Sequence, residues 1–285
     1  GIDFVAGAAH APLAAFKNWK GAKLLGALAQ GMYWMLVVRS DLNAERGEIN
    51  AVKGLKIGAA PFVELGLRRL LKESGIDIDK VHRIPIGINL DNFEAQTKVN
   101  REAIRRYLGL PLSAIVIGSF QKDGDGWGSG IEPKLIKGPD TFLRVVALLK
   151  LRIPELHILL SGPSRGYVKE GLTRMGVPFY HVFPKHYKEV GRLFQALDLY
   201  LVTSRDEGGP KSLLESMASY VPLVTTRVGQ AVDLVDHGHN AWMVDTEDVE
   251  GLAHWAWHAI DQRVSIGPVS YTHLRAHETL RYLVW

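Results

Sequence analysis

The chain has 285 residues, of which 47% are hydrophobic and 22% are charged. These values are typical of one large or two smaller globular domains, and they exclude a disordered or fibrous protein. Cysteine is absent, which excludes disulfides, cysteine-ligated zinc, iron–sulfur clusters and thiol nucleophiles. The net charge is only +4 and the sequence has no basic stripe, so a nucleic-acid partner is not expected.

The first third of the chain predicts the back half of an α/β domain. It contains expected helices at 22–38, 40–53 and 62–75, a short strand at 55–60 and a strand at 81–88 that leads into a linker. The apolar run 24–38 has 15 residues, which is short of the roughly 20 that a membrane-spanning helix needs. We therefore expect a buried or interfacial helix there, and a truncated N-terminal α/β domain with its linker over residues 1–93.

The rest of the chain alternates strands with amphipathic helices. The expected strands, rich in Val, Ile and Leu, are 114–120, 157–162, 179–183, 198–204, 222–226 and 241–245, and the expected helices are 139–151, 167–176, 187–197, 210–220, 228–235 and 249–260. Strands without polar alternation indicate a parallel sheet that helices cover on both faces. The fold class is therefore α/β, with a complete Rossmann-like domain over residues 94–267 whose ligand binds at the carboxyl ends of the strands.

The last residues, 268–285, show neither capping residues nor a hydrophobic period that continues the preceding pattern. The string VSYTHLRAHET within them resembles translated sequencing-adapter read-through. We therefore expect this segment to be a non-native tail and exclude it from the fold prediction.

The segment 204–222 has the strongest signature of a binding site. It leaves an expected strand, turns through Gly208 and Gly209, and enters a helix whose first residue is expected to be a proline. The glycines let backbone approach a ligand, and the helix start offers N–H groups and a positive dipole end, which suit a phosphate. Glu207 precedes the helix and Glu215 lies about 7–8 Å further along its axis. Carboxylates on both sides of a phosphate site suit a sugar nucleotide, whose hydroxyls need acceptors.

These residues resemble a known motif. Glu207 and Glu215, separated by seven residues in EGGPKSLLESMA, are similar to the Glu-x7-Glu motif of retaining glycosyltransferases with two Rossmann-like domains (the GT-B fold), in the large group 1 family that includes sucrose synthases and mannosyltransferases. The similarity extends over most of the chain: the linker RIPIGINLDNF at 83–93, the strand and Lys-Gly pair of 117–138, the glycine-rich strand end of 159–167 and the closing segment 222–245.

The resemblance implies roles for individual residues. Glu215 would accept hydrogen bonds from the ribose hydroxyls of the donor, while Glu207 would face the donor sugar and balance its developing positive charge. Lys137 would neutralise the departing diphosphate. The phosphates would be bound by the loop and helix start, and mainly by backbone N–H groups, at Gly208, Gly209, Lys211 and Ser212.

One position departs from the family pattern. The family often has an arginine just after the glycine of the first donor-domain strand, where this chain has Ser119. Lys122 or Lys134, in the long loop DGDGWGSGIEPKLIKG, is expected to supply the missing phosphate cation. Asp123 and Asp125 alternate with glycines there, but the closing bidentate Glu of an EF-hand is absent, so a calcium site is not expected.

Other polar residues near this segment have simpler explanations. Arg205, just before Glu207, is expected to pair with a nearby carboxylate rather than to take part in catalysis. His237 and His239 flank a glycine in an expected surface turn and lack an evident third ligand, so no metal site is expected.

Together these features predict a glycosyltransferase that moves a sugar from a nucleotide-diphosphate donor to a hydroxyl acceptor with retention at the anomeric carbon. We expect no metal cofactor, because lysines and a helix start can replace a cation on the diphosphate. The expected partners are the nucleotide-sugar donor and a carbohydrate or lipid-linked acceptor, in a cytoplasmic protein for which a peripheral membrane contact stays open. Two alternatives also stay open: a sugar-nucleotide epimerase of similar architecture, and a donor-binding fragment without catalytic activity.

Overall fold

The computed structural model describes residues 45, 48–53, 68–76 and 87–262. The chain divides into two units, residues 1–84 and 85–285, so the linker residues from 85 onward belong to the second unit. In the first unit the described residues form a 3-10 helix, η3 (Ile49–Val52), and a helical stretch over 68–73. That stretch confirms the end of the helix expected at 62–75. At 40–53, the described part is a 3-10 turn rather than the expected helix.

Several expectations fall on residues outside the described ranges. They are the helix at 22–38, the strand at 55–60, most of the strand at 81–88 and the tail at 268–285. Within the described ranges, no helix is long and apolar enough to cross a membrane.

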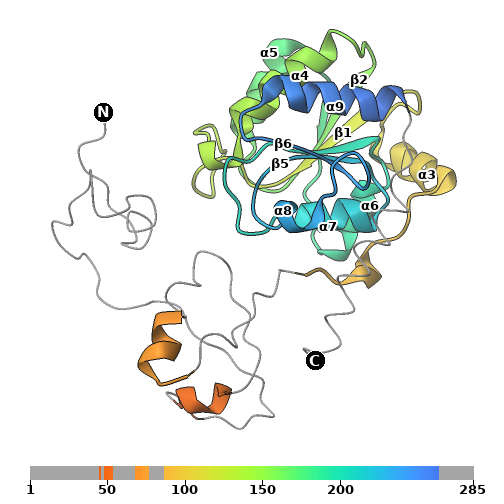
Figure 1. The fold of residues 1–285 in the computed structure, drawn as a ribbon. Coiled ribbons are helices and arrows are strands. Elements are labelled where there is room, and N and C mark those ends of the chain that lie inside the picture. Colours follow the sequence, from red (N-terminus) through yellow and green to blue (C-terminus); the bar gives the residue numbers. More distant parts are fainter. Residues whose placement is uncertain (1–44, 46–47, 54–67, 77–86, 263–285) are drawn as a thin grey trace, which may run out of the picture. The chain divides into compact units, whose positions relative to one another are not determined.

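The second unit is built on a six-stranded parallel sheet with the order β3-β2-β1-β4-β5-β6 (Figure 1). Its strands are β1 (Ile115–Phe120), β2 (Leu156–Ser161), β3 (Phe179–His181), β4 (Leu199–Val202), β5 (Leu223–Thr226) and β6 (Trp242–Val244). Each strand overlaps its expected range, which confirms the Rossmann-like sheet. The strand order reverses between β1 and β4, and the crevice at such a point is where open parallel sheets bind ligands.

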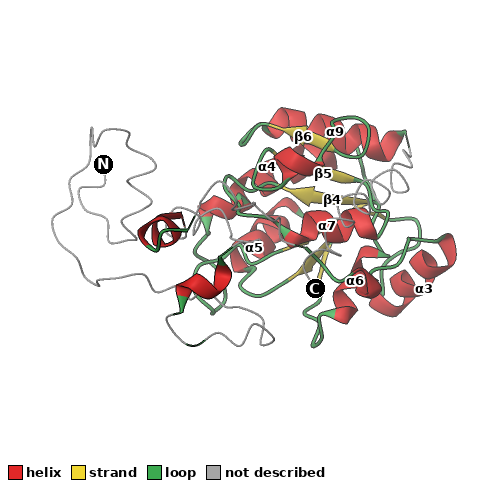
Figure 2. Cartoon of the chain, turned by 60° about the horizontal axis from the view of Figure 1, so that its bottom comes forward, coloured by secondary structure: helices red, strands yellow, loops and turns green. Residues whose placement is uncertain are grey.

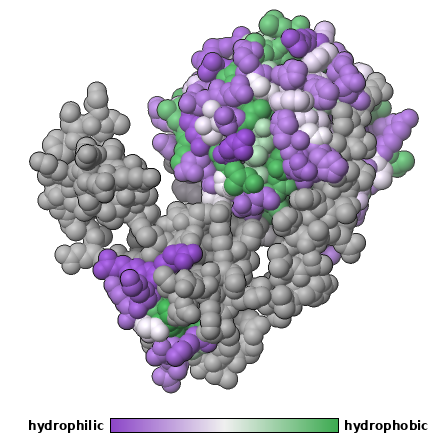
Figure 3. Space-filling view, viewed as in Figure 1, coloured by the Kyte–Doolittle hydropathy of each residue, from purple (hydrophilic) through white to green (hydrophobic). Residues whose placement is uncertain are grey.

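Helices cover both faces of this sheet. One layer contains α4 (Pro139–Lys150), α5 (Gly166–Met175) and α9 (Val249–Asp261), and the other contains α6 (Lys188–Phe194), α7 (Lys211–Ala218) and α8 (Ala231–Leu234). In Figure 2, strands β4, β5 and β6 lie between α9 and α7. From the side seen in Figure 1, the surface of this unit is mostly hydrophilic, with small apolar areas between polar ones (Figure 3).

The absence of polar alternation in the strands has a direct cause. In β1, Val116 packs into the layer of α6 and α7, while the next residue, Ile117, packs into the layer of α4 and α9. In β4, Tyr200 likewise packs into the layer of α6 and α7, and Leu201 packs into the layer of α4 and α9. Because both faces are buried, every position of a central strand is apolar or small.

Helix α3 (Lys98–Leu108) was missing from the sequence prediction. Its sequence, KVNREAIRRYL, is mostly polar and contains few apolar residues. The capping signals were present. Thr97 accepts a hydrogen bond from the N–H of Asn100, and Gly109 ends the helix in the left-handed region at φ 71°.

A buried ion pair attaches α3 to the sheet. Arg105 is 1% exposed, and its Nη2 lies 2.6 Å from Oδ2 of Asp198. The same guanidinium donates to the carbonyls of Ala196 and Ala114, at 2.9 and 2.8 Å. Asp198 in turn accepts the N–H of Val116 at 2.7 Å. This network joins the helix to the amino ends of β1 and β4, which lie at the edge opposite the expected ligand site.

Replacing Arg105 by methionine should lower the free energy of unfolding by about 3–5 kcal/mol, because it breaks a buried ion pair and takes the donor from the buried carbonyls of Ala196 and Ala114. Asp198 keeps the partly exposed Arg101 as an ionic partner. The control is Arg106→Met, which removes an exposed pair with Glu102 on the same helix and should cost less than about 1 kcal/mol. Urea denaturation followed by circular dichroism measures both. Equal losses in the two variants would contradict the role of the buried pair.

Candidate functional site

The loops that follow β1, β4 and β5 meet at the carboxyl ends of these strands. Gly138 has φ +62°, and a Cβ atom there would lie 1.9 Å from the carbonyl oxygen of Thr203. Thr203 Oγ1 donates a hydrogen bond to the carbonyl of Gly138 at 2.9 Å. In the loop after β5, a Cβ atom on Gly229 would lie 2.5 Å from the carbonyl oxygen of Glu207. Only glycine permits these approaches, and they fix the three loops against each other.

Lys137 and Glu207 contact each other at this junction. The Nζ of Lys137 lies 2.5 Å from Oε1 of Glu207, and the two side chains are 24% and 12% exposed. Ser204 Oγ also donates to Oε1 of Glu207, at 3.0 Å. The structure thus brings together the two residues to which the sequence analysis gave catalytic roles, although they come from different loops.

Glu215 lies in α7, one helix turn beyond the loop, in a different environment. It is 5% exposed, and burial raises the pKa of its carboxyl group. Two neighbours oppose this effect and favour the charged form: the hydroxyl of Tyr187 donates to Oε1 at 2.5 Å, and Lys211 is nearby in the same helix. Glu207 is therefore paired with a cation, whereas Glu215 is held by a neutral donor.

The start of α7 differs from the sequence prediction by one residue. Pro210 was expected to be the first helical residue, but it is the N-cap, with extended ψ of 110°, and the helix begins at Lys211. Proline has no side chain that can cap a helix, and none is bonded there. The first N–H groups, of Lys211 and Ser212, therefore suit an anionic ligand, as do the adjacent Gly208 and Gly209.

The two lysines of the glycine-rich loop lie in different settings. The Nζ of Lys122 lies 4.3 Å from the ring centre of Trp127, in a cation–π contact within its own loop. Lys134 directly precedes the 3-10 helix η6 (Leu135–Lys137), and its N–H donates to the carbonyl of Asp123 at 2.8 Å. A phosphate-binding role for either lysine stays a prediction.

Arg165, which the sequence analysis did not consider, is buried beside Ser119. Its Nη1 donates to the carbonyls of Ser119 and Ser161, at 2.5 and 2.7 Å, and its Nη2 donates to Ser119 Oγ at 3.0 Å. Its Nε lies 2.9 Å from Oδ1 of Asp123. A guanidinium is therefore buried beside Ser119, the position at which the family often has an arginine, and Asp123 neutralises it. Asp123, the first acidic residue of the glycine-rich loop, is thus engaged by an arginine.

The predicted pairing of Arg205 with a nearby carboxylate is confirmed. Its guanidinium binds both carboxylate oxygens of Asp140, at 2.8 and 2.7 Å, and contacts Glu247 at 2.8 Å. The arginine holds the pKa of Asp140 below its usual range. His237 bonds to the backbone of Met243 through Nδ1. Among the residues that the structure describes, no three His, Asp or Glu side chains are grouped as metal ligands.

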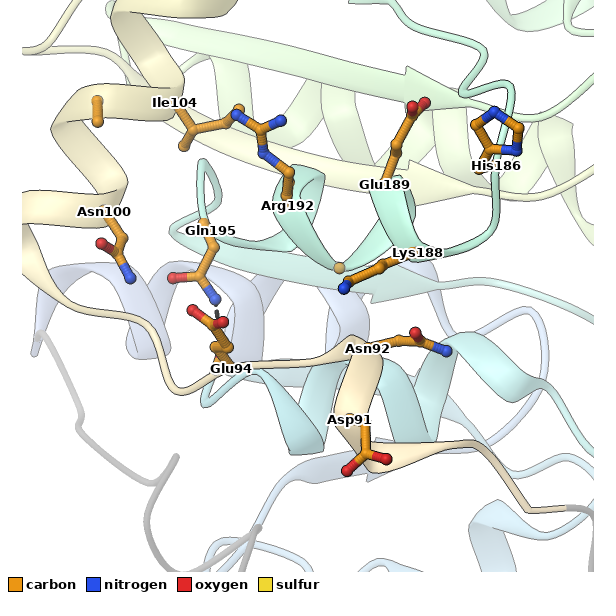
Figure 4. A pocket seen from close by; sticks show the side chains of 12 residues that line it. Asp91, Asn92, Glu94, Asn100, Ile104, His186, Lys188, Glu189, Arg192 and Gln195 are labelled. Atoms are coloured by element: carbon orange, nitrogen blue, oxygen red, sulfur yellow. Dashed lines mark hydrogen bonds between the residues drawn. The ribbon is translucent and has the colours of Figure 1, made fainter.

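A cavity of about 630 Å³ lies between α3, α6 and the 3-10 helix η5 (Leu90–Asn92) (Figure 4). None of its lining residues was a predicted site residue. His186 and Lys188 line it and flank Tyr187 in the chain, so the cavity borders the segment that contacts Glu215. Neither Tyr187 nor Arg165 could be assigned from sequence spacing, since both reach the site through loop geometry.

Comparison with known sequences identifies relatives. The sequence profile of the family described as glycosyl transferases group 1 matches residues 129–261. A D-inositol 3-phosphate glycosyltransferase of Corynebacterium urealyticum is 28% identical over 218 residues, which are 70% of this chain and 49% of that protein. The same enzyme of Mycobacterium leprae is 30% identical over 212 residues, which are 70% and 45%. The chain thus spans about half the length of these curated relatives.

Solved structures share the fold. HepE of Anabaena, in complex with UDP and glucose, has a TM-score of 0.59 at 20% identity, covering 84% of this chain and 62% of that chain. Sucrose-phosphate synthase of Thermosynechococcus elongatus has a TM-score of 0.59 at 18% identity, covering 84% and 59%.

A third structure is a single domain. The C-terminal domain of the group 1 glycosyl transferase LpcC of Francisella tularensis has a TM-score of 0.53 at 17% identity, covering 70% of this chain and 100% of that domain. The second unit therefore has the fold of the C-terminal domain of a GT-B glycosyltransferase. Residues 129–261 of this unit match the glycosyl transferases group 1 family.

Proposed function

We propose that the protein transfers a sugar from a nucleotide-diphosphate-sugar donor to a hydroxyl acceptor with retention of configuration at the anomeric carbon. The observation that carries the proposal is the contact of Lys137 with Glu207 at the strand ends, with the buried Glu215 in the adjoining helix. The match of residues 129–261 to the family and the UDP complex of the HepE structure support the choice of donor class.

Each group has a task in this reaction. The Lys137 ammonium stabilises the negative charge that grows on the diphosphate as the sugar leaves, and the N–H groups of Lys211 and Ser212 bind phosphate oxygens. Glu207 accepts hydrogen bonds from the sugar and balances its positive charge in the transition state. Its contact with Lys137 holds both charges where the bond to the sugar breaks. Glu215 accepts the ribose hydroxyls.

Lysine and a helix start supply positive charge at the diphosphate, so the proposal requires no metal ion. The acceptor, a carbohydrate or lipid-linked hydroxyl, and a cytoplasmic location with peripheral membrane contact belong to the same proposal. The direct assay incubates the protein with UDP-sugars, with and without a panel of hydroxyl acceptors that includes D-inositol 3-phosphate, the compound in the names of the relatives.

Three outcomes of this assay separate the proposed function from its alternatives. Transfer to an acceptor, with the anomeric configuration of the donor seen by NMR, supports the proposal. Epimerised donor in the absence of acceptor would instead identify an epimerase. Binding of donor without any turnover would identify a donor-binding fragment.

Glu215→Gln should weaken binding of the nucleotide by roughly 1–3 kcal/mol, the scale of a hydrogen bond to a charged group. The helix should be retained, because Gln and Glu have similar helix propensities. Calorimetric titration with UDP measures the effect, and Glu102→Gln, on the exposed face of α3, is the control. If the folded Glu215→Gln protein binds UDP with unchanged affinity, Glu215 is not part of the donor site.

Lys137→Ala should lower turnover at saturating donor by about 100-fold or more, the scale of one preorganised electrostatic contact. Donor affinity should fall much less, because the lysine interacts more strongly with the transition state than with the bound donor. Lys137→Arg should rescue only partly, since a planar guanidinium does not reproduce a compact charge.

The control for Lys137→Ala is Lys150→Ala, at the far end of α4, where the ammonium binds backbone carbonyls. It should leave turnover unchanged. Turnover of Lys137→Ala near that of the unmodified protein would exclude Lys137 as the phosphate cation and leave Lys122 or Lys134 for this role.

A further inference from the structure

Tyr187 precedes helix α6 and contacts the carboxylate that the proposed function assigns to ribose. Its hydroxyl donates to Oε1 of Glu215 at 2.5 Å. The tyrosine is 45% exposed, whereas Glu215 is 5% exposed. The phenol therefore lies between the carboxylate and solvent while its own ring stays accessible. A single oxygen of Glu215 is engaged in this hydrogen bond.

The ring of Tyr187 is held in place by the linker. It packs edge-to-face against Phe93, with ring centres 6.0 Å apart and planes at 75°. Phe93 is 6% exposed and also packs edge-to-face on Phe194 of α6, at 6.2 Å. Helix α6 approaches the linker closely, because a Cβ atom on Gly191 would lie 2.0 Å from the carbonyl oxygen of Asn92. The hydroxyl is thus presented to Glu215 by packed elements.

The charge state of Glu215 depends on the groups that face it. These are Tyr187 from the start of α6, Lys211 from α7 itself, and Tyr200 from β4, whose hydroxyl is bonded to the backbone of Phe120. Burial raises the pKa of Glu215, and the Tyr187 hydrogen bond is the larger of the two effects that lower it. Burial and Glu215 also raise the pKa of Tyr187, so its hydroxyl keeps its proton and remains a donor near neutral pH.

We propose that Tyr187 is a positioning residue for donor binding: its hydroxyl fixes Oε1 of Glu215 and leaves the second carboxylate oxygen to accept hydrogen bonds from the ribose of a nucleoside diphosphate. The inference rests on the proposed function, because that function assigns Glu215 to the ribose. Tyr187 itself does not contact the reacting atoms. It acts through the orientation and the charge of Glu215.

Tyr187→Phe tests this directly, because it keeps the ring that packs on Phe93 and removes only the hydroxyl. The probe is UDP, titrated calorimetrically from pH 5 to pH 8. The Kd at pH 7 should rise about 10-fold, near the lower end of what one hydrogen bond to a charged group contributes. The loss of affinity toward acid pH should begin at a higher pH than in the unmodified protein, because the pKa of Glu215 rises when its donor is removed.

A matched control is Tyr180→Phe, which removes a hydroxyl bonded to the carbonyl of Gly109 at 3.1 Å, at the end of α3. This variant should keep both the Kd and the pH profile of the unmodified protein. A purely structural role of Tyr187 would lower the melting temperature without shifting the pH profile of UDP binding, so the melting temperature of each variant is measured as well.

Glu215→Gln separates failure of the inference from failure of the proposed function. If Glu215→Gln weakens UDP binding while Tyr187→Phe binds UDP as the unmodified protein does, or more tightly, the positioning role is overturned and the donor site stands. If UDP does not bind, or if Glu215→Gln leaves its Kd unchanged, the proposed donor site fails and the inference fails with it.

Discussion

The contact between Lys137 and Glu207 depends on a backbone approach that glycine alone permits. Residue 138 lies against the carbonyl of Thr203, and a Cβ atom there would be 1.9 Å from that oxygen. The approach is reinforced by the hydrogen bond from Thr203 to Gly138 and by the N–H of Arg205, which donates to Ile136 at 2.8 Å. These bonds join the loops that leave β1 and β4, the strands between which the sheet order reverses, and so place the two charged side chains on one spot.

The two glutamates of the site differ through their surroundings. Glu207 lies in a loop against a lysine, and Glu215 lies in a helix, buried under a phenol. A carboxylate paired with a cation can balance charge that develops in a reaction. A carboxylate held by a neutral donor can serve as a fixed hydrogen-bond acceptor. These different environments support the division of tasks between sugar and ribose that the proposed function assigns.

The sheet and most helices of the second unit could be predicted from the sequence. Strands buried on both faces have continuous apolar sequences, and the helices between them are amphipathic. The resemblance to the group 1 family pointed to Glu207, Glu215 and Lys137, and the structure brings Lys137 and Glu207 together at one edge of the sheet. Their roles stay a prediction. Helix α3 was missed, since much of its attachment to the sheet is made by Arg105, a residue that pattern analysis places on the surface.

Arg165 and Tyr187 were missed for another reason. Each follows an expected strand by several residues and reaches the site through a turn whose path depends on tertiary packing. Arg165 needs the glycine-rich loop folded against it, with Asp123 as its partner. The ring of Tyr187 is held in position by packing against Phe93 of the linker. Neither requirement leaves a local pattern in the sequence.

The central claim is that Glu207 serves the sugar of the donor and not its nucleotide. The most direct test compares the Kd values of UDP and UDP-glucose for Glu207→Gln and for the unmodified protein. The Kd of the variant for UDP should be no more than roughly two-fold higher than that of the unmodified protein. The reason is that Lys137 loses a competing carboxylate and remains available to the diphosphate. It should lose most of the additional affinity that glucose provides. Equal weakening of UDP and UDP-glucose would contradict the account, because it would place Glu207 at the nucleotide or in the support of the fold.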